Sequence, residues 1–331
     1  MRPHQQLDPD MYVRVVEKRK DGIIVNGAKL NITAPAVSNE MVVMPHTALC
    51  EEDKDFAVVF AVPIDAPGLT IIPRPTGHAR PTEIDYPVSQ KYGQVECHCF
   101  FDHVFIPWEK VFLCGEWDMA ARLMAINIRL ERHLVAGCAA GKADLKIGAA
   151  ALAAEYSGID HVAAVRERLL NMVEVAEILN ALGISAAYEG EMHPSGVFMP
   201  AAVPANLIKH YAASTSSALS DHCMDIGGAI VSSIPTEADI KNPTTRPLIE
   251  KYLKTKANVP VADRIRAIKL LEDLTVTPFA GWYIIMDLLG GGSSAAAKVG
   301  MRRAVDWEKW KKVAQIQAGI NKEEDVIDVL A

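Results

Sequence analysis

The sequence contains no block of basic residues, no uninterrupted apolar run of membrane-spanning length and no apolar segment near residue 1. Its 34 Lys and Arg residues are scattered singly and the formal net charge is −7, which argues against a nucleic-acid partner. Gly, Ser or charged residues interrupt every apolar run before about 18 residues, so we expect no membrane partner. The first residues also lack the apolar core of a signal peptide. We therefore expect a cytoplasmic protein.

The cysteines are too few for a disulfide framework. Six of them in 331 residues fit reduced thiols and leave room for one metal ligand. Half of the residues are hydrophobic, so the chain can bury a large core, and its length suggests two domains.

The first third of the chain has the pattern of β-structure. Residues 11–19 and 22–33 predict a hairpin whose turn is Lys20-Asp21-Gly22. Further short apolar runs follow at close intervals, with most prolines at their ends, where a missing N–H is harmless. We expect a small β-barrel or sandwich domain over residues 1–115.

From Trp117 the pattern changes to helical spacing of Ala, Leu and Ile. We expect a helical bundle over residues 116–331, with breaks at Gly158, at residues 193–196 and near Asn242. The stretches 199–220 and 279–299 carry few charges and should lie centrally in the bundle. The fold class is therefore α+β, with a β domain followed by a C-terminal helical bundle.

A lone cysteine followed by small residues lies in the first long helix. Glu131 and Cys138 are seven residues apart and share a face, while His133 is about 140° around the helix from Cys138. Cys138 and Glu131 are thus weak candidate metal ligands. Fe–S clusters are usually held by several thiolates, so we expect no complete cluster from this chain alone. The alternative is a close helix–helix contact through small residues.

Residues 96–99 alternate between the two faces of a predicted strand. Cys97 and Cys99 point one way and are interpreted as core thiols rather than metal ligands. Glu96 points the other way, where a partly buried carboxylate beside a ligand could act as a general acid or base. The alternative is a surface glutamate on an edge strand.

Two glycine motifs interrupt the helical half. The first, around Gly291, Gly292 and Ser293, exposes backbone N–H groups at a helix N-terminus, where a phosphate can bind. It matches neither the dinucleotide fingerprint nor the P-loop. The second is the pair Gly227 and Gly228. Either motif could equally be a simple helix break.

Segments spread over nearly the whole chain resemble one known family, the flavin-dependent 4-hydroxyphenylacetate 3-hydroxylase/4-hydroxybutyryl-CoA dehydratase family, which has the acyl-CoA dehydrogenase architecture. The helical half resembles the dehydratase branch more than the aromatic hydroxylases. The resemblance is carried by residues 2–5, 8–18, 22–33, 55–63, 101–108, Cys138, 146–151, 225–228, 242–243, 249–254, 263–266 and 292–294.

The resemblance implies a fold and a set of site residues. The family has an N-terminal helical domain, a central β domain and a C-terminal bundle, and the first of these is expected to be absent here. Glu96 corresponds to an active-site glutamate and Thr33 to a residue at the flavin edge. The glycine motifs correspond to FAD-contacting loops, with Gly227 and Gly228 meeting the adenine half across a subunit interface. Cys138 corresponds to a cluster cysteine, while Glu131 stands where the dehydratases have a histidine ligand.

The resemblance also implies a cofactor, substrates and partners. The cofactor is FAD, with a [4Fe-4S] cluster only if a partner chain completes it. The substrate is an acyl-CoA or an aromatic acid. We expect a homo-oligomer or a partner subunit carrying the missing helical domain. Three functions stay open: a 4-hydroxybutyryl-CoA dehydratase/vinylacetyl-CoA isomerase type of enzyme, a reduced-flavin-dependent monooxygenase, and a non-catalytic subunit of a split enzyme.

Overall fold

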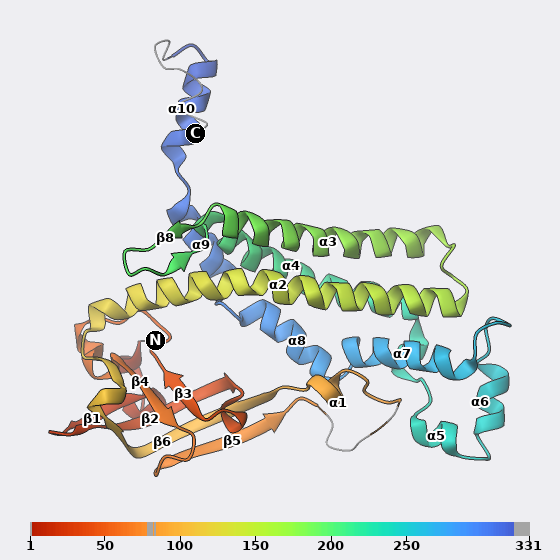
Figure 1. The fold of residues 1–331 in the computed structure, drawn as a ribbon, viewed down its shortest axis with the longest axis horizontal. Coiled ribbons are helices and arrows are strands. Elements are labelled where there is room, and N and C mark those ends of the chain that lie inside the picture. Colours follow the sequence, from red (N-terminus) through yellow and green to blue (C-terminus); the bar gives the residue numbers. More distant parts are fainter. Residues whose placement is uncertain (1, 78–81, 83, 321–331) are drawn as a thin grey trace.

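A computed structural model describes residues 2–77, 82 and 84–320 (Figure 1). Strands fill the first third of the chain and long helices fill the rest, which confirms the expected α+β class. Strand β7 ends at Cys114 and helix α2 begins at Trp117, close to the predicted domain boundary. Residues 321–331 of the predicted helical domain lie outside the described residues.

The β part consists of two antiparallel sheets that share one apolar core. Inward side chains from both sheets, among them Phe60, Cys97, Cys99 and Phe101, fill that core, so the domain is a small sandwich. The larger sheet has the order β1-β2-β6-β5 and the smaller the order β3-β4-β7. Their bounds are β1 Arg14–Lys18, β2 Gly22–Thr33, β3 Glu40–Val43, β4 Val58–Pro63, β5 Leu69–Pro75, β6 Val95–Pro107 and β7 Val111–Cys114.

The predicted hairpin and the predicted core thiols are confirmed. Arg14 pairs with Asn26, and Arg19 N donates to Gly22 O at 2.8 Å across the turn. Cys97 and Cys99 are almost completely buried, and burial raises the pKa of Cys99 to about 11. The Cys99 thiol therefore stays protonated and apolar in character.

The helical part is built around three long helices that lie side by side (Figure 1). Helix α4 packs against α2, α3, α7, α8 and α9, which confirms that the low-charge stretch 199–220 is central. Helix α10 projects away from the rest of the molecule (Figure 1). The bounds are α2 Trp117–Ser157, α3 Ala163–Tyr188, α4 Ala202–Gly227, α5 Glu237–Lys241, α6 Arg246–Tyr252, α7 Val261–Thr275, α8 Pro278–Leu289, α9 Ser294–Ala304 and α10 Trp307–Gln317.

The two parts of the chain are interlocked. Ile84 and Val88 pack into the core of the helical part, and the short helix α1 Ser89–Tyr92 follows them. The amides of Val88 and Ser89 donate to Asp273 Oδ2 at 2.9 and 2.8 Å. The division into residues 1–115 and 116–331 therefore stays a prediction about domains, because this segment of the first part belongs to the packing of the second.

Among the described residues, α3 is the one helix whose length and composition would allow it to cross a membrane. Helix α3 packs against both α2 and α4 in the bundle. Met172, Leu179 and Ala186 are buried in these contacts. A core helix of a bundle passes the same test of length and composition, so this feature carries no argument for a membrane.

Candidate functional site between the sheet and helix α8

Glu96, Thr33 and Trp282 come together at the junction of the larger sheet and helix α8. Glu96 on β6 faces Thr33 on β2 in the strand register. Thr33 Oγ1 donates to Glu96 Oε1 at 2.9 Å, and Trp282 Nε1 donates to the same oxygen at 2.7 Å. Two predicted site residues from different strands are thus hydrogen-bonded to each other.

Glu96 does not lie on an edge strand. Strand β6 is an interior strand with β2 on one side and β5 on the other, and Glu96 pairs with Thr33 and Arg74 in the two registers. The alternative reading of Glu96 as an edge-strand surface residue is therefore wrong. A half-buried carboxylate fixed by two donors has a defined orientation, which a surface glutamate lacks.

Trp282 belongs to an aromatic cluster on α8. Its ring stacks on Phe279 with centroids 6.1 Å apart and lies 5.3 Å from Tyr283. Phe279 is fully buried and anchors α8 in the helical core. Lys142 Nζ lies 5.3 Å above the Tyr283 ring, a cation–π distance. The aromatic cluster thus connects the carboxylate of the β part to helix α2.

On helix α2, the residues that pack against other helices differ from the residue with the exposed thiol. Ala136, Ala139 and Ala143 are buried in contacts between helices, whereas Cys138 is exposed. The close-contact reading therefore applies to the alanines and not to Cys138. His133 Nε2 lies 3.1 Å from Gly183 O on α3, on a different face from Cys138 as predicted.

A buried polar network lies one and two turns beyond Cys138. Lys142 forms an ion pair with Asp287, and Ser216 Oγ donates to the other oxygen of that carboxylate at 2.7 Å. Lys209 is completely buried and donates to the main-chain oxygen of Asp287. Lys146 donates to Ser220 Oγ at 2.7 Å. Burial lowers the pKa of Lys209 to about 8 and also lowers that of Lys146.

The loop at Gly291 and Gly292 is tied to helix α2. Gly291 N donates to Glu131 Oε1 at 2.9 Å, and Arg132 Nε donates to Gly291 O at 2.9 Å. Gly292 N donates to Leu289 O at 3.0 Å. Both glycines have positive φ, at 69° and 84°, which explains why glycine occupies them. The amides of these two glycines are therefore used within the chain and do not point freely towards a ligand.

Ser293 and Glu131 have structural partners of their own. Ser293 Oγ caps helix α9 by accepting from Ala296 N at 3.1 Å. Glu131 lies two helical turns from Cys138, a rise of about 10 Å, and its carboxylate faces Gly291 rather than Cys138. In the described part of the chain, the group of three donor side chains close enough for one metal ion includes neither Cys138 nor Glu131.

Gly227 and Gly228 differ from each other. A Cβ on Gly227 would lie 2.3 Å from Val231 Cγ2, so close packing requires glycine there. Gly228 is exposed, has φ +69° and ends helix α4. Asn206, near the start of α4, accepts a hydrogen bond from Arg132 beside the first glycine motif. The two motifs thus lie at opposite ends of α4, about 32 Å apart, so one copy of the chain does not bring them together.

Two cavities in the described residues lie away from this junction. One of about 20 Å³ is lined by residues that include Pro3, Lys29 and Phe56. The other, of about 450 Å³, is lined by residues that include Lys18 and Cys114. Thr33 is exposed and Glu96 is half-buried, so the junction is an open surface rather than a closed pocket.

The sequence analysis missed Trp282, Arg132 and the buried lysines. The spacing of Cys138, Lys142 and Lys146 at four-residue intervals was a usable signal, because it places all three on one face of α2. Lys209, a cation inside a helix with few charges, was a second signal. Nothing local to Trp282 indicated its hydrogen bond to a residue 186 positions away.

Two family models match the chain. The model described as "4-hydroxyphenylacetate 3-hydroxylase N terminal" matches residues 1–113, and the model described as "4-hydroxyphenylacetate 3-hydroxylase C terminal" matches residues 120–319. The chain is also 33% identical over 330 residues to a 4-hydroxybutyryl-CoA dehydratase/vinylacetyl-CoA-Delta-isomerase of Clostridium aminobutyricum, covering 96% of this chain and 67% of the relative.

Solved structures also superimpose on the chain. An oxygen-tolerant archaeal 4-hydroxybutyryl-CoA dehydratase from N. maritimus superimposes with a TM-score of 0.91 at 33% identity, covering 98% of this chain and 65% of that one. The oxygenase component of 4-hydroxyphenylacetate 3-monooxygenase, solved with FAD and 4-hydroxyphenylacetate, gives a TM-score of 0.88 at 25% identity, covering 98% and 68%. A glutaryl-coenzyme A dehydrogenase, at 16% identity and a TM-score of 0.55, shares the fold. The chain spans about two thirds of the length of the family relatives.

Proposed function

The chain belongs to the 4-hydroxyphenylacetate 3-hydroxylase family, and from this premise we propose that it is the FAD-binding part of a 4-hydroxybutyryl-CoA dehydratase type of enzyme. The observation that carries the proposal is the carboxylate of Glu96, fixed by Thr33 and Trp282 where strand β2 ends and strand β6 begins. The dehydratase type is favoured over the oxygenase type because identity to the dehydratases reaches 33%, against 25% for the FAD-bound oxygenase.

The residues around Thr33 fit a flavin. Thr33 is exposed at the end of β2, and its hydroxyl can accept a hydrogen bond while it donates to Glu96. Trp282 offers an aromatic side chain beside it. The amides of Gly291 and Gly292 fit less well because both are bonded within the chain. We therefore propose that Thr33 contacts the ring system directly, and that Gly291, Gly292 and Ser293 shape the neighbouring loop.

FAD, when bound, supplies the one- or two-electron chemistry at the Cα and Cβ atoms of the acyl group. Glu96 moves the proton. Its Oε1 accepts both hydrogen bonds, so within the described residues Oε2 is the oxygen that is open to a substrate proton. Because Thr33 and Trp282 are neutral donors, they orient the carboxylate without neutralising it.

The rest of the site requires a second chain. We propose that Gly227 and Gly228 meet the adenine half of FAD bound to another copy, since they lie about 32 Å from the first glycine motif. We propose that Cys138 joins a [4Fe-4S] cluster only when a partner chain provides the other thiolates. The exposed thiol is accessible to such a partner.

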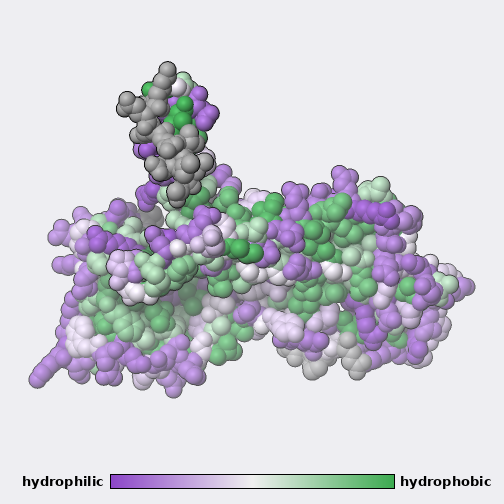
Figure 2. Space-filling model, turned by 45° about the horizontal axis from the view of Figure 1, so that its top comes forward, coloured by the Kyte–Doolittle hydropathy of each residue, from purple (hydrophilic) through white to green (hydrophobic). Residues whose placement is uncertain are grey.

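Exposed apolar side chains support an oligomer or a partner subunit. Leu134, Leu170 and Ile184 are each more than 60% exposed on α2 and α3. Figure 2 shows apolar surface along the helical part of the molecule. Trp307 and Trp310 are exposed on the projecting helix α10 (Figure 1). Large apolar side chains on one continuous face are typical of interfaces.

A monooxygenase is the second candidate function. The observation that favours it is Glu131, which stands in the place of a cluster ligand and is bonded to Gly291 N. An enzyme of that type needs a flavin and an acid or base but no cluster. A non-catalytic subunit is the third candidate, supported by the amides of Gly291 and Gly292, which are bonded within the chain.

The test is to purify the chain alone and with its candidate partner, measure bound FAD and iron, and assay three reactions. The proposal predicts FAD in the complex and turnover of 4-hydroxybutyryl-CoA or vinylacetyl-CoA. Oxygen-dependent hydroxylation of 4-hydroxyphenylacetate with reduced flavin, and no reaction of the acyl-CoA, would favour the monooxygenase. Complete absence of flavin from every preparation would favour the non-catalytic subunit and overturn the proposal.

A further inference from the structure

Three side chains that the proposed function does not use converge near the start of the chain. His4 Nδ1 lies 2.7 Å from Asp53 Oδ1, and Cys50 Sγ lies 3.2 Å from Asp53 Oδ2. His4 Nδ1 and Cys50 Sγ are 3.9 Å apart. Nitrogen, sulfur and oxygen donors from segments 46 positions apart in the sequence thus surround one point.

The arrangement differs from that of a nucleophilic triad. In a triad the imidazole bridges the other two groups, with one ring nitrogen towards the nucleophile and the other towards the carboxylate. Here the same atom, His4 Nδ1, faces both Asp53 and Cys50. The thiol donates to the carboxylate, and interactions with Glu52, burial and Asp53 raise the pKa of Cys50. A protonated thiol beside carboxylates is a poor nucleophile.

The three donor atoms resemble three of the four corners of a tetrahedral metal site. Zinc bonds of about 2.0–2.3 Å place neighbouring tetrahedral ligands roughly 3.3–3.7 Å apart. The three donor separations of 2.7, 3.2 and 3.9 Å bracket that range, so shifts of about half an ångström would complete it. Imidazole, thiolate and carboxylate are all zinc ligands.

The local charge also suits a divalent cation. Asp53 is completely buried. Its carboxylate accepts hydrogen bonds from the backbone and ring of His4 and from Cys50, so its oxygens face the two other donor groups. Glu52 interacts with the thiol of Cys50. The nearest opposing charge is Arg2, whose NH1 lies 3.9 Å from Asp53 Oδ2 on a half-exposed side chain that can turn into solvent.

We propose that His4, Cys50 and Asp53 bind a zinc-class divalent metal ion, with Glu52 or water in the fourth position. On binding, the S–H bond of Cys50 breaks and its proton goes to the buffer, while the imidazole proton of His4 moves from Nδ1 to Nε2 through solvent. Metal–sulfur and metal–nitrogen bonds form in their place. The metal replaces the hydrogen bonds that now join the segment around His4 to the segment around Cys50.

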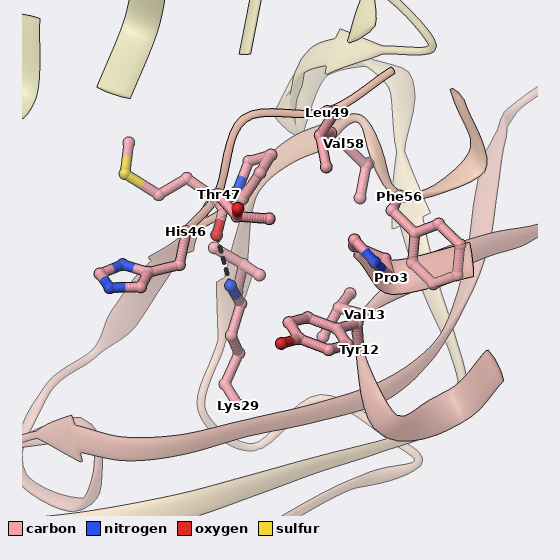
Figure 3. Close-up of a pocket in the computed structure, with 12 residues that line it drawn as sticks. Pro3, Tyr12, Val13, Lys29, His46, Thr47, Leu49, Phe56 and Val58 are labelled. Carbon is pink, nitrogen blue, oxygen red and sulfur yellow. Dashed lines mark hydrogen bonds between the residues drawn. The ribbon is translucent and has the colours of Figure 1, made fainter. Parts of the chain in front are cut away.

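This site would fix one wall of the small cavity on the β part. Pro3 and Phe56 lie next to each other on that wall (Figure 3). Lys29, whose ammonium group donates to the carbonyl of Met44, lies on the opposite side (Figure 3). Pro3 precedes His4, and Phe56 ends the short helix that begins beside Cys50, so a metal ion would hold the two together.

The test is titration of the full chain with Co²⁺ and Zn²⁺ under reducing conditions. We expect one metal ion per chain, a cobalt–thiolate charge-transfer band, and displacement of Co²⁺ by Zn²⁺. His4→Asn and Cys50→Ser should each weaken binding by about tenfold or more. Asp53 also accepts main-chain hydrogen bonds from His4 and Cys50, so these two variants are more informative than Asp53→Asn.

Matched controls separate this site from other thiols. Cys114→Ser, at another half-buried free cysteine, and Cys138→Ser, at the exposed thiol of α2, should leave affinity and the thiolate band unchanged. Loss of the band in Cys138→Ser but not in Cys50→Ser would overturn the proposal. So would the absence of saturable binding, or equal affinity in wild type, His4→Asn and Cys50→Ser.

Discussion

The junction at Thr33 and Glu96 and the glycine loop at Gly291 were both predicted from the resemblance to the family. Thr33 and Gly291 were predicted as flavin contacts and Glu96 as an active-site acid or base. In the structure they use their polar groups differently. At the junction, Thr33 is exposed, and its hydroxyl donates to the half-buried Glu96 where strand β2 ends and strand β6 begins. In the loop, Gly291 is buried and its N–H and C=O are bonded to Glu131 and Arg132.

This difference shows that a glycine motif can stabilise a loop through hydrogen bonds within the chain rather than contact a ligand. Glycine at residue 291 is explained by its left-handed backbone and by Arg132, whose Cγ would lie 3.2 Å from an added Cβ. Thr33 also suits strand β2 because its side chain is β-branched, but this preference does not explain its hydrogen bond to an oriented carboxylate. We therefore expect substitutions at the junction to change chemistry and substitutions at the loop to change stability.

Glu96→Gln should show the largest effect on activity. The glutamine oxygen can still accept the bonds from Thr33 and Trp282, but the side chain no longer exchanges a proton. We expect kcat of the complete enzyme to fall by about 10²–10⁴, with the thermal midpoint unchanged. Glu40→Gln, at an exposed glutamate of β3 paired with Lys110, is the control. A kcat within tenfold of wild type would contradict the assigned role.

Arg132→Ala should show the largest effect on stability. Arg132 is 6% exposed and donates to Gly291 O and to Asn206 Oδ1. Its removal leaves both acceptors buried without a donor, which should lower the free energy of unfolding by about 2–4 kcal/mol. Urea denaturation measures this, with the exposed Arg122→Ala as control. A loss under about 0.5 kcal/mol would show that the loop does not depend on this anchor.

Gly291→Ala also tests whether the glycine loop serves stability. A positive φ costs a non-glycine residue about 1–2 kcal/mol. Gly196→Ala is the matched control, because its φ is +83° and nothing lies within 4 Å of an added Cβ. We expect Gly291→Ala to lose more stability than Gly196→Ala in urea denaturation, since only the first meets Arg132. Equal losses would mean that the contact with Arg132 is unimportant.

Much of the fold was predictable because its signals are local. Alternation of apolar residues marked the strands, and the turn at Lys20-Asp21-Gly22 marked the hairpin. The change to helical spacing fell at Trp117, where α2 begins. The interior position of β6 was not predictable, because it depends on β2 and β5 pairing with it from distant parts of the chain.

The candidate site was only partly predictable for the same reason. Glu96 and Thr33 were found through family motifs, and their contact follows from strand register. Trp282 lies in an apolar helix and resembles any core residue until α8 is placed against the sheet. The bond between Glu131 and Gly291 depends on how a loop packs on α2, so a glycine motif alone could not reveal that its amide was already used.

The measurement that most directly tests the central claim is FAD titration of Thr33→Val, in the chain or complex that binds flavin. The claim is that the flavin lies at the end of β2, where the Thr33 hydroxyl meets it. Loss of one neutral hydrogen bond should weaken FAD binding by about 2- to 12-fold. Thr70→Val, at an exposed threonine of β5 in the same sheet, should leave the affinity unchanged. Equal affinities of wild type, Thr33→Val and Thr70→Val would contradict the account.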